Sequence, residues 1–213
     1  MNHNYSMPYY TPNANHDFEE FAFMRGATVL VDRWCFCRYR AVKAFLDRIT
    51  PFLSQHRMQL CLAKSAQSDI RRQMADPSTE PSYRRSLQSG LEIIRALDEA
   101  GMIRYLGAES ESTERIFLTH ILYNRESNIV VLTQQKWLYD DVLQFNALRT
   151  VRGNEVQIRR LDNDGCLACF VDSPQPAFAP APAAAHGRYE AERREKKTPQ
   201  PAVDGVLMRL GLV

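Results

Sequence analysis

Short apolar runs, each followed by a stretch with helical spacing, are the feature that most constrains the fold of this chain. The runs are ATVLVD at 27–32, MQLCLA at 58–63, MIRYLG at 102–107 and NIVVLT at 128–133. Consecutive apolar residues in runs this short are typical of strands buried on both faces of a parallel sheet. Because helical patterns separate the runs, the sequence predicts an α/β domain, a three-layer sandwich with a mainly parallel central sheet.

Composition divides the chain into four parts. Residues 1–22 are rich in Asn, Tyr, Pro and His, without an apolar period, and are expected to form a disordered N-terminal arm. Residues 23–171 carry the predicted α/β domain. Residues 172–201 form a Pro/Ala-rich and then charged linker, and 202–213, AVDGVLMRLGLV, end it with a short apolar segment.

Charge and cysteine content limit the class of protein. The chain has 27 Lys and Arg against 25 Asp and Glu, a formal charge of +2, so nucleic-acid binding would need a local basic patch. No run is long and apolar enough for a membrane span, and the N-terminus lacks a signal pattern. The five cysteines do not suggest a disulfide framework. These features predict a cytoplasmic protein without membrane contact, and a homodimer is compatible with them.

Near the end of the domain, VQIRRL at 156–161 alternates as an edge strand does, and NDG marks a turn before CLACFV. The paired cysteines CFC at 35–37 and GCLAC at 165–169 raise the alternative of a zinc site. However, structural zinc sites prefer gaps of two to four residues, and CFC has a gap of one. The cysteines are therefore interpreted as small apolar side chains.

Acidic residues follow several of the predicted strands. The carboxyl ends of parallel strands meet at one edge of a sheet, where open α/β sheets bind ligands. The acids near such ends are Asp32, Asp69, Glu111, Glu114, Asp140 and Asp141. Carboxylates from separate elements can bind Mg²⁺ or Mn²⁺ and activate water for phosphodiester hydrolysis. The alternative is that these acids only cap helices or interact with helix dipoles.

The order ATVLVD, CLAKSAQSDIRRQM, ESTERIFLTHILYN and NIVVLTQQKWLYDDV resembles that of PIN domains, a family of metal-dependent ribonucleases. The resemblance covers roughly residues 27–171 and implies a PIN-like fold with Mg²⁺ or Mn²⁺ as cofactor. It implies catalytic and metal-binding roles for Asp32, Asp69 and Glu114, with Glu111 as the other choice for the third acid. Thr133 and Gln135 would support the site.

This chain departs from the family pattern at two places. Where the family commonly has a fourth acid the chain has Gln135, and Trp137 replaces a further acid two residues later. After Asp32 the family tends to have a small polar residue and Asn, whereas this chain has Arg33 and Trp34. A cation at Arg33 would compete with a metal for Asp32, and each lost carboxylate lowers the affinity for a divalent ion.

Basic and aromatic residues indicate a second type of site. The residues predicted to bind RNA are Arg33, Trp34, Arg38, Arg40, Arg71 and Arg72. Guanidinium contacts to phosphate and aromatic stacking on bases are how single-stranded RNA is held. The alternative is an ordinary solvated surface.

Three hypotheses about function follow. The first is a PIN-like, divalent-metal-dependent endoribonuclease acting on single-stranded RNA. The alternative is a catalytically degenerate PIN-like module that binds RNA or protein and recruits a partner through residues 202–213. The third is an unrelated doubly wound domain whose acids are helix caps, although no glycine-rich phosphate loop is present.

Overall fold

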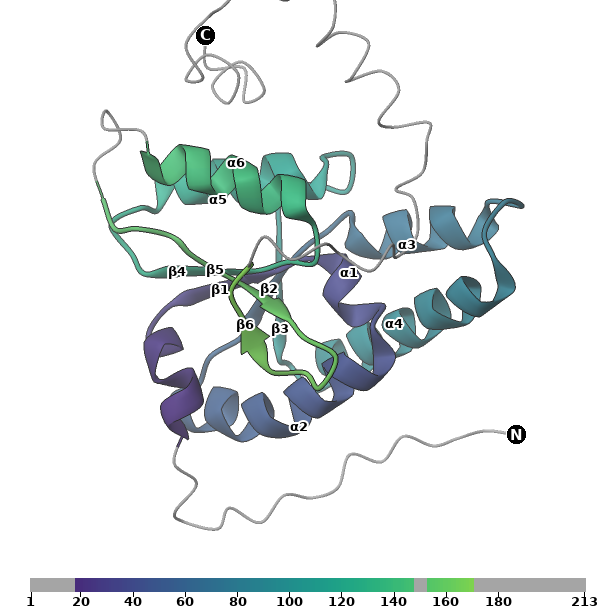
Figure 1. The fold of residues 1–213 in the computed structure, drawn as a ribbon, viewed down its shortest axis with the longest axis horizontal. Coiled ribbons are helices and arrows are strands. Elements are labelled where there is room, and N and C mark those ends of the chain that lie inside the picture. The colour runs from purple at the N-terminus through teal and green to yellow at the C-terminus, as the bar shows by residue number, and fades with distance from the viewer. Residues whose placement is uncertain (1–17, 148–152, 171–213) are drawn as a thin grey trace, which may run out of the picture.

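In the computed structural model, residues 18–147 and 153–170 are described (Figure 1). The predicted arm up to residue 17, the linker 172–201 and the apolar segment 202–213 lie outside these ranges. The described residues form an α/β domain with a six-stranded, mostly parallel sheet. Within them, no helix is both long and apolar enough to cross a membrane.

The sheet has the strand order β3-β2-β1-β4-β5-β6. The strands are β1 (Thr28–Val31), β2 (Leu60–Ala63), β3 (Ile103–Leu106), β4 (Ile129–Leu132), β5 (Gln157–Leu161) and β6 (Leu167–Ala168). Neighbours from β3 to β5 are parallel, and β6 is antiparallel to β5. The chain adds β2 and β3 on one side of β1 and then returns to add β4 on the other side. The strand order therefore reverses between β1 and β4, where open α/β sheets bind their ligands.

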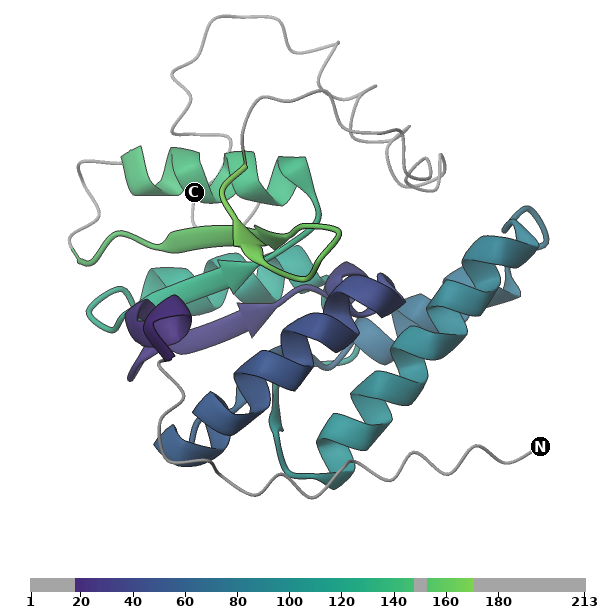
Figure 2. The ribbon, with the colours of Figure 1, turned by 60° about the horizontal axis from the view of Figure 1, so that its bottom comes forward.

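Helices cover both faces of this sheet (Figures 1 and 2). They are η1 (Phe18–Met24), α1 (Arg33–Phe36), α2 (Tyr39–His56), α3 (Ala66–Ala75), α4 (Pro81–Glu99), α5 (Thr113–Tyr123) and α6 (Lys136–Ala147). Val29 and Val31 of β1 pack with the core residues of α2 and α4, whereas Leu30 packs with those of α5 and α6. Alternate side chains of a strand point to opposite faces, which is why an uninterrupted apolar run marks this strand.

The four strands predicted before residue 147 are present as β1 to β4, and each is followed by a helix as expected. At the end of α4, Gly101 adopts a φ of 68° directly after the C-cap Ala100. A left-handed residue at this position is common at helix ends, and glycine adopts it without a Cβ penalty.

Two expectations need correction. VQIRRL is not the edge strand, because β5 pairs with β4 on one side and with β6 on the other. Its alternation reflects strand β5 lying between these partners with partly exposed faces. The packed region also begins before residue 23, since η1 starts at Phe18 and Phe21 is buried against Phe45 and Phe52. Aromatic residues in a stretch without helical period gave no sequence signal for this 3₁₀ segment.

Candidate functional site

Asp32 lies at the carboxyl end of β1, beside the point where the strand order reverses. The parallel register places Val31 opposite Leu132, and the Asp32 amide donates to the Leu132 carbonyl at 2.8 Å. Its side chain is 1% exposed. One carboxylate oxygen accepts from the Trp34 amide at 3.5 Å and so caps α1. The capping role considered from the sequence is therefore present.

Thr133 holds the other oxygen of Asp32. This residue is fully buried at the end of β4, and its hydroxyl donates to Asp32 Oδ2 at 3.0 Å. The same hydroxyl accepts from the Gln135 amide at 3.0 Å, which fixes the turn before α6. Gln135 itself keeps a buried Oε1 that has no hydrogen-bond partner among the described residues. The turn thus binds Asp32 through Thr133, while Gln135 contributes its backbone.

The guanidinium of Arg33 lies among the predicted metal ligands. Its Nη1 donates to Thr113 Oγ1 at 2.6 Å and lies 3.4 Å from Asp69 Oδ2 and 3.8 Å from Glu114 Oε1. The Arg33 side chain is only 12% exposed, against 18% for Asp69 and 24% for Glu114. The structure therefore brings two predicted acids from α3 and α5 to one point, and an internal cation connects them.

At this edge of the sheet, burial raises the pKa of two carboxyl groups and the charge of Arg33 lowers it. Burial raises the pKa of Asp32 to about 6, while the Arg33 charge and the Thr133 hydrogen bond act in the opposite direction. Burial also raises the pKa of Asp69, partly offset by Arg33 and Arg72. The Glu114 charge raises the pKa of both carboxyls. The three acids thus interact electrostatically, with Arg33 as the nearest buried counter-charge.

The arrangement does not fit a Mg²⁺ or Mn²⁺ ion as it stands. Such ions need several oxygen ligands at about 2.0 to 2.2 Å from one centre. Here Arg33 Nη1 lies between the oxygens of Asp69 and Glu114, and Asp32 is engaged by Thr133 and the α1 amide. In the described part of the chain, no group of three or more His, Cys, Asp or Glu residues is arranged to hold a metal.

The remaining acids have local partners. Glu111 accepts from the Ala108 amide at 2.9 Å, and Asp140 pairs with Lys136 one helical turn away at 2.8 Å. Asp141 is buried within α6. Glu111 and Asp140 thus have their partners within their own segments.

The residues predicted to bind RNA have different partners within the domain. Arg38 donates to the Leu161 carbonyl at 2.7 Å and to Gln134 Oε1 at 2.8 Å, so it ties the ends of β4 and β5. Trp34 is partly buried against the core, with the Arg33 guanidinium 4.8 Å from its ring centre. These side chains have structural partners within the domain.

The other three arginines differ in their partners. Arg72 pairs with Asp69 at 3.3 Å, Arg71 donates to Gln67 at 3.1 Å, and both are exposed. Arg40 is exposed near the start of α2. RNA binding by this group of basic and aromatic residues stays a prediction.

Two residues of this edge were not identified from the sequence as site residues. Thr113 accepts from Arg33, although its only sequence signal was its place at the start of a helix. Ser65, two residues after the end of β2, is 3% exposed, and its hydroxyl has no hydrogen-bond partner among the described residues. A polar residue following a buried strand was the available signal for Ser65.

Comparison with protein-family models, with curated proteins and with solved structures found no match for this chain.

Proposed function

We propose that this chain is a catalytically degenerate PIN-like module that acts by binding a partner, without a divalent metal at its strand ends. The observation that carries the proposal is the position of Arg33, whose Nη1 lies 3.4 Å from Asp69 and 3.8 Å from Glu114. A guanidinium neutralises carboxylates as a metal would, but it supplies neither a Lewis acid nor an activated water. The PIN-like assignment itself rests on the resemblance in sequence order.

The contacts that Arg33 and Arg38 make within the domain favour a protein partner over RNA. Arg33 and Arg38 are engaged by acids, carbonyls and an amide inside the domain. Their donors are therefore directed to protein oxygens, and phosphate would have to displace those contacts. The apolar residues of segment 202–213 remain the candidate for partner recruitment.

The experiment is isothermal titration of Mn²⁺ into the full chain, with Asp32→Asn and Arg33→Ser run beside it. We expect no binding to the wild-type chain and none to Asp32→Asn. Arg33→Ser should gain binding, because it removes the competing cation while keeping all three acids. Circular dichroism of each variant provides the check on folding.

The nuclease hypothesis makes the opposite prediction in the same titration. Wild-type binding that disappears in Asp32→Asn, together with Mn²⁺-dependent cleavage of single-stranded RNA, would overturn the proposal. It would return Asp32, Asp69 and Glu114 to the catalytic roles implied by the family resemblance.

A further inference from the structure

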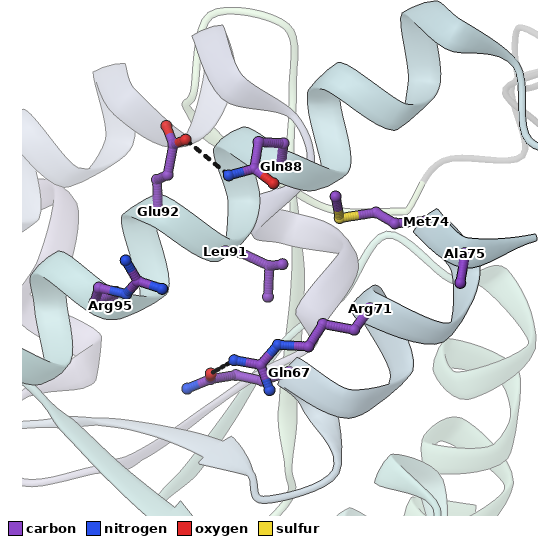
Figure 3. Close-up of a pocket in the computed structure, with 8 residues that line it drawn as sticks. All are labelled: Gln67, Arg71, Met74, Ala75, Gln88, Leu91, Glu92 and Arg95. Atoms are coloured by element: carbon purple, nitrogen blue, oxygen red, sulfur yellow. Dashed lines mark hydrogen bonds between the residues drawn. The ribbon is translucent and has the colours of Figure 1, made fainter. Parts of the chain in front are cut away.

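A pocket lies between α3 and α4, on the side of α3 that contributes Arg71 and Met74. Its volume is about 430 Å³, and it is lined by Gln67, Arg71, Met74, Ala75, Gln88, Leu91, Glu92 and Arg95. Figure 3 shows these side chains, with Met74 and Leu91 between the polar ones. We call this pocket the α3–α4 groove.

The groove combines an apolar floor with a charged rim. Met74 and Leu91 are partly buried and also pack against the main core, so their positions are fixed from behind. On the rim, Arg71 donates to Gln67 at 3.1 Å and Gln88 donates to Glu92 at 2.9 Å. Such a groove suits a short amphipathic segment, with apolar side chains on the floor and a polar edge at the rim.

Arg95 indicates the charge of the occupant. It is exposed on α4, and it makes no hydrogen bond or ion pair with any other residue in the ranges 18–147 and 153–170. Glu92 is the one acid among the lining residues, and Gln88 already donates to it. A segment with an acid beside an apolar stripe would complement this rim.

Segment 202–213 of the same chain has that composition. Val203, Val206, Leu207 and Leu210 recur at the spacing of one helical face, and Asp204 adjoins the start of this stripe. Residues 171–202 connect Phe170 to Val203, and a chain of that length spans at most about 115 Å. That limit exceeds the roughly 40 Å diameter expected for a compact domain of this size, so the connection reaches any face.

We infer that segment 202–213 docks in the α3–α4 groove of its own chain, with its apolar stripe on Met74 and Leu91 and Asp204 paired with Arg95. A segment held there is covered, so a protein partner that binds the segment competes with the groove. The inference goes beyond the proposed function and does not depend on the absence of a metal.

The test is hydrogen exchange of the full chain, read by mass spectrometry on peptides covering 203–213. The wild-type chain should protect these amides several-fold relative to a free peptide of the same sequence. Arg95→Glu and Asp204→Arg should each reduce the protection, and the two combined should restore it, because the charge pair is rebuilt in reverse. Arg85→Glu is the matched control, since it makes the same charge change at an exposed position of α4 outside the groove.

Each alternative outcome overturns the inference. Unprotected wild-type amides, or a double variant no better protected than the single ones, would show that the groove does not hold this segment. Protection that disappears on dilution would assign the groove to the segment of a second copy. Because the readout is amide exchange and not Mn²⁺ binding, failure here is distinguishable from failure of the proposed function.

Discussion

Helix α3 contributes to two regions that treat charge in opposite ways. At the strand ends, Asp69 meets the buried guanidinium of Arg33, and the charges compensate one another inside the domain. At the α3–α4 groove, Arg71 and Met74 form part of an accessible pocket, and Arg95 on the opposite helix has no ionic partner among the described residues. In the first region the charges are paired within the described domain, whereas in the second the Arg95 guanidinium has no partner among the described residues. Bringing acids together at the strand ends and leaving them without a counter-charge are therefore separate properties of the fold.

Replacing Arg33 should sharpen this contrast most strongly. Arg33→Ala leaves Asp69 and Glu114 without their shared cation while both remain largely buried. We expect the free energy of unfolding to fall by about 3 to 5 kcal/mol, measured by urea denaturation at pH 7. The matched control is Arg72→Ala, because Arg72 contacts the same Asp69 but is 79% exposed. That variant should change stability by less than about 1 kcal/mol. Equal losses in the two variants would contradict a special role for the buried cation.

Asp32 should make the free energy of unfolding depend on pH. Its pKa in the folded chain is about 6, above the ordinary value of 3.8, so the folded state binds this proton more tightly than the unfolded state. The resulting stabilisation is fully present below about pH 4 and is lost as pH rises through 6, a change of about 3 kcal/mol. In Asp32→Asn the part of this decline that comes from Asp32 should be absent, as urea titrations from pH 4 to 7 would reveal.

Asp69 contributes to the same decline, because its pKa is raised too and the residue is retained in the variant. We therefore expect a residual slope in Asp32→Asn, with the same sign as in the wild-type chain. An unchanged pH profile would mean that Asp32 is not the buried carboxyl that controls it.

Thr133→Val tests the hydroxyl that links Asp32 to the turn at Gln135. The substitution removes a donor to a buried carboxylate and an acceptor for a backbone amide at nearly constant side-chain size. We expect the free energy of unfolding to fall by about 1 to 3 kcal/mol, measured by thermal or urea unfolding.

In the α3–α4 groove, Gln88→Ala removes an exposed hydrogen bond to Glu92 and should lower the free energy of unfolding by less than about 0.5 kcal/mol. A larger loss at Gln88 would show that the groove is also a closed structural network.

Much of the fold followed from local patterns. The uninterrupted runs around Val29, Leu62 and Val131 predicted strands buried on both faces, and the structure has β1, β2 and β4 there. The weaker parts were those without a period, such as η1 with its buried Phe21. The place of β5 was also wrong, since VQIRRL was expected at the edge of the sheet and the two-residue strand β6 pairs beyond it.

The sequence named the acids at the strand ends, but it did not predict that Arg33 would contact Asp69 and Glu114. The order of strand ends indicated that Asp69 and Glu114 would approach each other, and their shared contact with Arg33 agrees with that expectation. Metal binding by these acids stays a prediction that the Mn²⁺ titration tests. The role of Thr113 as an acceptor for Arg33 depends on residues 80 positions apart, which no local pattern specifies.

The sequence alone therefore determined the α/β class, the positions of the main strands and the acids that follow them, because hydrophobic periodicity and strand-end position are local properties of the chain. Only the tertiary structure decided that Arg33 points into those acids and that Arg95 stays at an open rim. Arg33 begins the short helix α1 directly after a predicted strand, whereas Arg95 lies within α4. The sequence suggested only that Arg33 would compete for Asp32, and the structure places its guanidinium against Asp69 and Glu114. Their difference arises from what the folded chain places within reach of each guanidinium, since charge compensation depends on distances and burial that exist only after folding.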